Sequence, residues 1–446
     1  MFVTKVNLRE ESTEPVLPGM TLPEASEIEA GSGLHGALSR GRVRGALAIL
    51  GPAFVASVAY VDPGNFATNF AAGAQFGYAL VWVILMANLM AIFVQYLTSK
   101  AGLYTGRSLP ELCAQRFGKK TNGFLWVQAE IVAMATDLAE FVGAAVGLYL
   151  IFGIDLFPAG IITAFVAFGI LALEQRGYRK FELAIIGLLS LIALGFLYTF
   201  FAVGDQDYKA MAEGVIPSLP GTGALALAVG IIGATVMPHV VYLHSALQKN
   251  RIRPKNQHEM RTLLKYNRID CIVGLGIAGL VNLSMLCIAA ALFNVPGLSQ
   301  IDDLIQIHGE LGTLVSGGAA LAFGVALMAS GFSSSSVGTY AGQVVMSGFM
   351  GWRIPLMLRR AITMAPALIV LALGVNTTDA LVFSQIVLSF GIPFALIPLI
   401  IITRDKSVMG GLVNRASTTA IVSVIALIIS GLNFYLLYDA FSGFFS

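Results

Sequence analysis

The stretch AYVDPGN at residues 59–65 interrupts an apolar run that extends from residue 46 to residue 72. Pro63 has no N–H to donate, so the carbonyl of Ala59, four residues earlier, loses its helical partner. Gly64 then lets the chain leave helical geometry. Inside a membrane, such a break is tolerated only where it is buried in protein or lines a wet cavity. The break therefore predicts a site rather than a plain membrane-spanning helix.

Polar side chains flank this break. Asp62 supplies a carboxylate in the middle of the apolar run, and Asn65 supplies an amide three residues later. An acidic residue inside a membrane is by default a candidate functional residue. Together with the carbonyl freed by the proline, these groups place three oxygen donors at mid-membrane depth, which indicates a cation site.

A second break, GATVMPH at residues 233–239, interrupts the apolar run at 224–247. Here Pro238 frees the carbonyl of Ala234, and Met237 places a thioether beside it. Two interrupted spans at corresponding positions in the two halves of a transporter mark its binding site. We expect the two breaks to face each other.

The composition is that of a polytopic membrane protein. Of the 446 residues, 57% are hydrophobic and only 12% are charged, and the 48 glycines allow close helix packing. The three cysteines form no metal-ligand spacing, and the sequence shows no nucleophile paired with a base. These features favour a transporter and exclude an obvious enzyme or a bound cofactor.

Eleven apolar runs are near or above the length of about 20 residues that a bilayer requires. Residues 1–44 precede them, are acidic and rich in proline and glycine, lack the apolar core of a signal peptide, and are predicted to be a disordered tail. The expected spans are 45–72, 78–98, 123–151, 157–173, 182–203, 223–247, 271–293, 313–337, 356–374, 379–402 and 417–441.

The basic residues predict the orientation. Of the 27 lysines and arginines, 26 lie in the tail and in alternate loops, and Lys209 alone falls on the other side. The positive-inside rule then places the N-terminus in the cytoplasm and the C-terminus outside the cell membrane.

Acidic residues form a stripe on the third expected span. At about 100° per residue, Glu130 and Asp137 share a face and Glu140 lies one turn further on. One interpretation is that these acids pair with basic groups and lock helices together. The other is a proton relay, because intramembrane acids mark such routes. Arg359 and Arg360, at the start of the ninth span, are the candidate basic partners.

The residues that form the two breaks match a known family. The motifs at 62–65 (DPGN) and 237–239 (MPH) resemble those of the Nramp divalent-metal transporters, and the resemblance extends over 45–441. The segment 331–343 also resembles that family's signature between spans eight and nine, although it departs from the usual residues at Phe332, Ser335, Ser336 and Val337.

The resemblance implies an all-α, LeuT-type fold with eleven transmembrane helices, of which helices 1 and 6 are discontinuous. Residues 45–222 would form the first inverted five-helix repeat and 223–402 the second, with the last span in 403–446. The metal, which is the transported substrate, would be held by Asp62, Asn65, Met237 and the carbonyls of Ala59 and Ala234, with Gln385 able to approach it in outward-open states. The implied proton pathway and salt-bridge network comprises Asp62, Asp137, Glu140, His239, Arg359 and Arg360.

Two functions fit these features. The first is a proton-coupled importer of Mn²⁺, Fe²⁺ or related ions such as Cd²⁺ and Co²⁺, in which the thioether of Met237 disfavours the hard ions Mg²⁺ and Ca²⁺. The second is a sodium-coupled transporter of amino acids or other organic solutes with the same architecture. The fixed charge of Asp62 argues against the second, because it would repel a substrate carboxylate.

Overall fold

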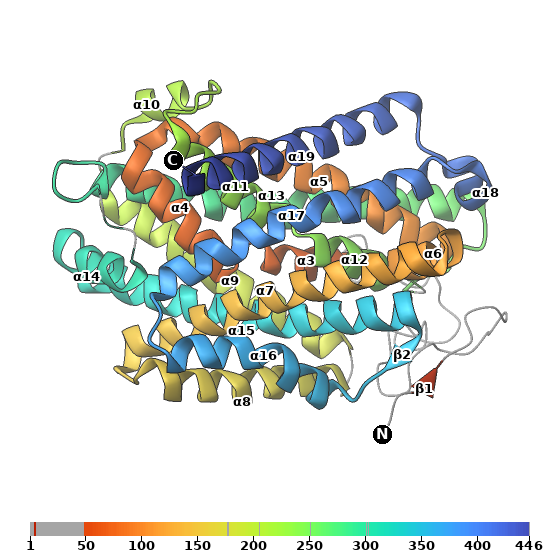
Figure 1. Ribbon diagram of the computed structural model, residues 1–446, viewed down its shortest axis with the longest axis horizontal. Coiled ribbons are helices and arrows are strands. Elements are labelled where there is room, and N and C mark those ends of the chain that lie inside the picture. The colour runs from red at the N-terminus through yellow and green to blue at the C-terminus, as the bar shows by residue number, and fades with distance from the viewer. Residues whose placement is uncertain are drawn as a thin grey trace.

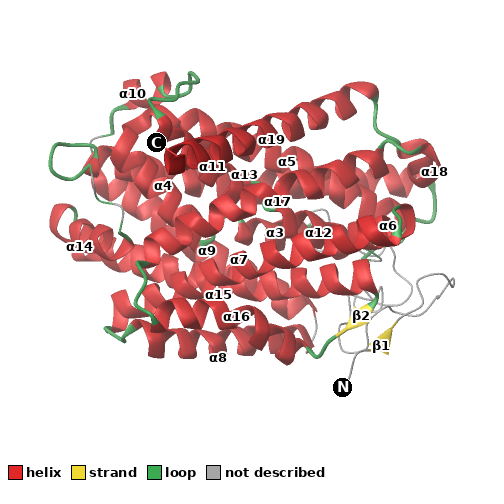
Figure 2. Ribbon diagram, viewed as in Figure 1, coloured by secondary structure: helices red, strands yellow, loops and turns green. Residues whose placement is uncertain are grey.

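Long helices lying roughly side by side make up nearly all of the protein (Figure 2). The computed structural model describes residues 4–5 and 49–445, apart from 176–177, 205, 250, 300 and 302. Most of the predicted disordered tail at 1–44 lies outside these described residues. Its one described part is the two-residue strand β1 (Thr4–Lys5), which pairs antiparallel with β2 (Trp352–Arg353).

The helices follow one another with short connections. In chain order they are α3 (Pro52–Ala59), α4 (Pro63–Phe76), η1 (Gly77–Leu80), α5 (Val81–Thr105), α6 (Leu109–Arg116), α7 (Lys119–Phe152), α8 (Leu156–Gln175), α9 (Tyr178–Val203), α10 (Tyr208–Glu213), α11 (Thr222–Thr235), α12 (Pro238–Gln248), α13 (Gln257–Phe293), α14 (Leu304–Leu314), α15 (Gly317–Met350), α16 (Leu356–Ala372), α17 (Thr377–Thr403), α18 (Lys406–Met409), η2 (Gly410–Leu412) and α19 (Ala416–Phe445).

Within the described residues, eight segments are long and apolar enough to cross a membrane. One of them, Pro63–Thr105, joins α4 to α5 through η1, and another, Gly223–Gln248, joins α11 to α12. Two shorter apolar stretches lie in α8 and α16. The protein is therefore an all-helical, multi-pass membrane protein.

Both predicted helix breaks are present. The helix α3 ends at Ala59 and α4 begins at Pro63, so residues 60–62 are not helical. The helix α11 ends at Thr235 and α12 begins at Pro238. In both cases the proline is the first residue of the second helix, where its missing N–H costs nothing.

The segment 331–343 lies elsewhere than expected. The resemblance placed it between spans eight and nine, but it is entirely helical within α15, which continues to Met350, and all of it except Phe332 is buried. Its serines satisfy their hydroxyl groups within the helix, as when Ser333 donates to the carbonyl of Ala329 at 2.7 Å. A polar run can therefore continue an apolar helix, and the change in hydropathy did not mark the helix end.

Close packing of α15 against α7 forms the centre of the bundle. A β-carbon added at Gly331 would lie 2.6 Å from the Cβ of Ala144, and one added at Gly147 would lie 2.7 Å from the backbone of Met328. In Figure 1, α6 and α18 lie at one end of this bundle, whereas α10 and α14 lie at the other. The helix breaks lie between these ends.

Candidate metal site

Asp62 is the N-cap of α4, and its buried carboxylate is surrounded by donors. One oxygen, Oδ1, accepts hydrogen bonds from the backbone N–H of Asn65 at 2.9 Å and from the Asn65 amide Nδ2 at 2.7 Å. The other, Oδ2, accepts from Nε2 of Gln385 on α17 at 3.2 Å. Aspartate at the N-cap followed by proline is a favourable helix start, so the sequence fixes this carboxylate locally.

Asn65 joins the two breaks. Its Nδ2 atom donates both to Asp62 and, at 3.1 Å, to the carbonyl oxygen of Ala234 at the end of α11. This is the carbonyl that Pro238 was expected to free. Ala59 is the last residue of α3 and is 1% exposed. The predicted proximity of the two breaks is thus observed in a direct hydrogen bond.

Two buried oxygens beside the carboxylate lack donors. Within the described part of the chain, neither Oδ1 of Asn65 nor Oε1 of Gln385 has a hydrogen-bond partner. Unsatisfied buried acceptors are costly, and a cation would satisfy them. Met237 is fully buried at the N-cap of α12 and brings a thioether to the second break.

This donor set is unlike the usual metal cluster. Among the described residues, no group of three or more His, Cys, Asp or Glu side chains is placed to hold a metal ion. The candidate site instead combines one carboxylate with neutral amide, carbonyl and thioether donors. Such a set has low charge and includes a soft ligand, which suits a divalent transition metal that must later leave.

Neighbouring helices hold the unwound backbone of the first break. Asn282 on α13 donates to the carbonyl of Tyr60 at 2.8 Å, and Ser330 on α15 donates to the carbonyl of Val61 at 2.5 Å. Nothing in the sequence singled out Ser330 for this role. A serine in an apolar span carries no signal of which distant carbonyl it serves.

A chain of polar groups leads from the first break to α12. The amide of Gln95 on α5 donates to the hydroxyl of Tyr60 at 2.5 Å, and its oxygen lies 2.9 Å from Nδ1 of His244. All three residues are buried. Nothing in the sequence indicated the role of Gln95, because its partners lie far away in the chain.

His239 contacts the acid-bearing helix. Its Nδ1 atom lies 3.2 Å from the hydroxyl of Thr136 on α7, and that hydroxyl is 3.0 Å from the carbonyl of Val132. Because the threonine proton serves that carbonyl, Nδ1 of the histidine is the donor, and Nε2 is left as an acceptor. Within the described residues, Nε2 has no partner. Asp137, next to Thr136, is buried.

Arg359 of α16 pairs with the first acid of the stripe. It donates from Nη1 to Oε1 of Glu130 at 3.2 Å and from Nη2 to Oε2 at 2.7 Å, and Trp126 also donates to this carboxylate. The locking role that the sequence allowed thus applies to Glu130. The side chain of Arg360 lies outside the described residues.

Glycines of α15 make room for these charges. A β-carbon at Gly338 would lie 2.7 Å from Oε2 of Glu140, and one at Gly342 would lie 2.5 Å from Nη2 of Arg359. The segment 331–343 therefore serves the charged network by its lack of side-chain bulk at two positions. Glu140 itself is fully buried.

The start of α3 is fastened at the end of the bundle that carries most basic residues. Asp270 on α13 accepts hydrogen bonds from the backbone N–H groups of Gly51 and Ala53, both at 2.9 Å. Arg251 donates to Glu182 at 3.0 Å and to the carbonyl of Leu50 at 3.3 Å. These contacts hold the first half of the broken span against α9 and α13.

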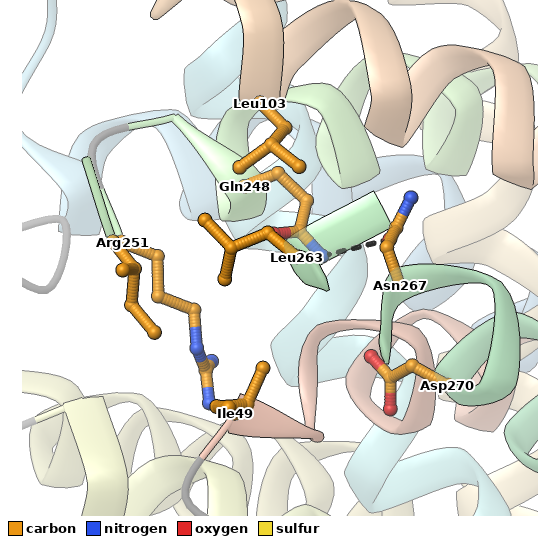
Figure 3. Close-up of a pocket in the computed structure, with 8 residues that line it drawn as sticks. Ile49, Leu103, Gln248, Arg251, Leu263, Asn267 and Asp270 are labelled. Carbon is orange, nitrogen blue, oxygen red and sulfur yellow. Dashed lines mark hydrogen bonds between the residues drawn. The ribbon is translucent and has the colours of Figure 1, made fainter. Parts of the chain in front are cut away.

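Figure 3 shows the small cavity that these groups line. Gln248, near the end of α12, points toward Asn267 of α13, to which it donates at 3.0 Å. The cavity volume of about 10 Å³ is enough for roughly one water molecule.

The arrangement has the fold of multi-pass membrane transporters. It is similar to the structure of Mhp1, a nucleobase-cation-symport-1 family transporter, with a TM-score of 0.61 at 14% identity, covering 88% of this chain and 90% of that one. Likeness at this level of identity defines the architecture, and the interrupted helices meet at its centre.

The family is defined by closer relatives. The family model "Natural resistance-associated macrophage protein-like" matches residues 53–439. The chain is 48% identical over 437 residues to the divalent metal cation transporter MntH of Deinococcus radiodurans, covering 97% of this chain and all of that protein. A mutant of the Eremococcus coleocola manganese transporter superposes with a TM-score of 0.83 at 29% identity, covering 96% and 92%. The chain belongs to the Nramp family.

Proposed function

We propose that the protein imports divalent transition metal ions, chiefly Mn²⁺ or Fe²⁺ and also Cd²⁺ and Co²⁺, together with protons by alternating access. The observation that carries this proposal is the contact of the two breaks at Asp62, Asn65 and Ala234, beside two buried oxygens that lack donors. Relatives that are named divalent metal cation and manganese transporters support it.

The Asn65 amide marks the place of the ion. Its Nδ2 atom lies between the Asp62 carboxylate and the Ala234 carbonyl, bridging two oxygens as a positive group would. Rotating the side-chain amide of Asn65 by half a turn would put its unpaired Oδ1 where Nδ2 now lies. The oxygens of Asp62, Ala234 and Asn65 would then all face the same point. Binding of the ion would thus replace the two hydrogen bonds of Asn65 with three oxygen ligands, and the sulfur of Met237 would be a further donor.

The proposed ligand set also gives selectivity. Mg²⁺ and Ca²⁺ prefer cages made entirely of oxygen, whereas Mn²⁺, Fe²⁺ and Cd²⁺ tolerate a thioether. A site with one carboxylate binds hard ions weakly, because it offers them little charge to offset their hydration. Met237 then favours the softer ions over the more abundant ones.

The proposed proton coupling depends on the repulsion between the metal ion and a proton at Asp62. A divalent cation that arrives beside Asp62 disfavours a proton on the same carboxylate, so the proton must leave. Nε2 of His239 is an available acceptor, and the Thr136 contact places this ring beside the turn of α7 that carries Asp137. We take Asp137 and Glu140 as the next acceptors, because both are buried acids on α7, the helix whose Glu130 pairs with Arg359.

For the topology we infer eleven crossings, in two inverted repeats of five followed by α19. The first crossing combines α3 with α4, and the sixth combines α11 with α12. The helices α8 and α16 add two further crossings, whose apolar stretches are shorter than those of the other spans. The basic residues favour a cytoplasmic N-terminus and an external C-terminus. The end that carries α6 and α18 would then face the cytoplasm.

The experiment measures Mn²⁺ uptake and lumenal acidification in the same proteoliposomes. The native protein should take up Mn²⁺ and acidify the lumen when Mn²⁺ is added. Asp137→Asn should bind Mn²⁺ but lose most metal-stimulated acidification, while Glu213→Gln, at a glutamate whose side chain is 66% exposed on α10, serves as control. Full acidification by Asp137→Asn would remove this residue from the relay, and absence of Mn²⁺ uptake by the native protein would refute the proposed function.

A further inference from the structure

A large cavity lies far from the metal site, where α5 ends beside α6, α17 and α18. Its volume is about 560 Å³, within the range of pockets that hold small organic ligands. The walls come from two segments, residues 104–116 and 402–408. Neither segment belongs to the two helix breaks or to the acidic stripe, so the transport chemistry leaves this cavity without a role.

The walls of the cavity are basic. Among the described residues, Arg107 and Arg116 are the charged side chains that line the cavity, whereas Glu111 and Asp405 lie in the same two segments but outside the lining. Glu111 is already bound by Lys249, whose Nζ lies 2.6 Å from its Oε1 in a buried ion pair. The cavity therefore offers a surplus of positive charge to a ligand.

Among the described residues, the side chain of each arginine that lines the cavity makes one polar contact. Arg107 donates from Nη1 to the side chain of Gln115 at 2.7 Å. Arg116 contacts Asp405 at 3.5 Å through Nε, and 54% of its side chain stays exposed. Hydrogen bonds from Ser407 keep the pKa of the Asp405 carboxyl below its usual value, so this acid stays charged and fixes Arg116.

The cavity also has apolar walls. Tyr104, Leu112, Ile402 and Val408 line it where the membrane spans α5 and α17 end. A cavity with basic and apolar walls at the ends of membrane spans suits a ligand with a charged headgroup and an apolar chain.

We propose that this cavity binds the headgroup of an anionic phospholipid, with its phosphate between Arg107 and Arg116 and the start of its chains against the apolar walls of the cavity. Basic pockets between helices on the cytoplasmic side bind lipids of this kind. The proposal uses the cytoplasmic orientation inferred above but does not depend on which metal is transported. Thr105, Gln115 and Ser407 provide hydroxyl and amide groups for the polar part of the headgroup.

Such a lipid would be connected to the metal site. The helix α6 is fastened to α12 by the Glu111–Lys249 pair and by the hydroxyl of Ser245, which accepts from the backbone of Leu109 at 2.7 Å. The helix α12 begins directly after Met237. A lipid that holds α6 would thereby stabilise the position of the second broken span.

Native mass spectrometry of the full-length protein tests the proposal with dipalmitoylphosphatidylglycerol as the probe and dipalmitoylphosphatidylcholine for comparison. The double variant Arg107→Gln/Arg116→Gln removes the proposed contacts. The matched control Lys119→Gln/Lys120→Gln removes two exposed charges from the neighbouring start of α7, which do not line the cavity. The double variant should bind the anionic lipid on the order of tenfold more weakly, whereas the control should bind it as the native protein does.

Three results would overturn the proposal. One is unchanged lipid retention by the double variant while it remains folded by circular dichroism. Another is equal retention of the zwitterionic lipid, which would show that the phosphate between the arginines is not selected by charge. The third is displacement of the lipid by millimolar inorganic phosphate, which would make free phosphate the occupant. Retention that depends on the arginines and resists phosphate supports a lipid site, whatever the outcome of the metal uptake experiment.

Discussion

The two broken spans resemble each other in sequence but differ in how the protein holds them. The first break is fastened to three other spans: α13 and α15 bind its backbone carbonyls, and α17 binds its carboxylate. In the second, the N-cap Met237 has no side-chain hydrogen bond, and the Ala234 carbonyl accepts from Asn65 of the first break.

If the two breaks form the proposed metal site, this difference predicts different tasks for its two halves. The first break carries the charge, and a buried charge must be fixed by many donors. The second carries a neutral sulfur and a carbonyl, which need no donors to offset a charge. Affinity should therefore depend on the first break and selectivity on the second. The following substitutions test this division.

The largest effect is expected at Asp62. Removing an outer partner of a metal ligand typically costs about 10–100-fold in affinity, so removing the charged ligand itself should cost more than about 100-fold. Isothermal titration calorimetry with Mn²⁺ measures this for Asp62→Ala. The control Asp155→Ala removes an exposed acid between α7 and α8. Binding of native strength by a folded Asp62→Ala protein would show that the charge lies elsewhere.

A selective effect is expected at Met237. Met237→Ala removes the soft donor, so Cd²⁺ should bind about tenfold more weakly, Mn²⁺ should be affected less, and Ca²⁺ should compete better. Uptake of Mn²⁺ with increasing Ca²⁺ measures the competition. Met134→Ala, at a methionine that is 36% exposed on α7, is the matched control. If Ca²⁺ competed equally with all three proteins, the second break would not set selectivity.

The smallest effect on metal binding is expected at Ser330. Ser330→Ala leaves the buried carbonyl of Val61 without its donor, which should destabilise the protein by about 1–3 kcal/mol. Mn²⁺ affinity should fall less than tenfold, because no ligand is lost. Thermal unfolding in detergent measures the stability, with Ser190→Ala on the exposed side of α9 as control. A melting temperature equal to that of the control would mean that the hydrogen bond from Ser330 does not stabilise the first break.

Local chemistry explains what the sequence could predict. The prolines at 63 and 238 place both breaks, because the missing N–H acts on its own helix whatever the surroundings. Asp62 as N-cap is a local interaction too. Residues whose role depends on distant partners could not be predicted in this way: Ser330, Gln95 and Thr136 reach groups 269, 35 and 103 positions away.

The error at residues 331–343 has a physical cause of the same kind. The resemblance placed this segment between two spans, yet a buried serine can donate to a carbonyl of its own helix and stay helical. Gly338 and Gly342 likewise appear as loop residues until the neighbouring Glu140 and Arg359 are known. Composition alone could not distinguish a loop from a helix that makes room for charged neighbours.

The central claim is that the two breaks share one metal ion, and X-ray diffraction from crystals grown with Mn²⁺ tests it most directly. An anomalous map collected near the manganese edge shows where the ion lies. We expect one strong peak within about 2.0–2.6 Å of the Asp62 carboxylate and of the Asn65 amide oxygen, with the Ala234 carbonyl and the Met237 sulfur on its other side. A peak that touches only one break, or that lies outside both, would contradict the claim.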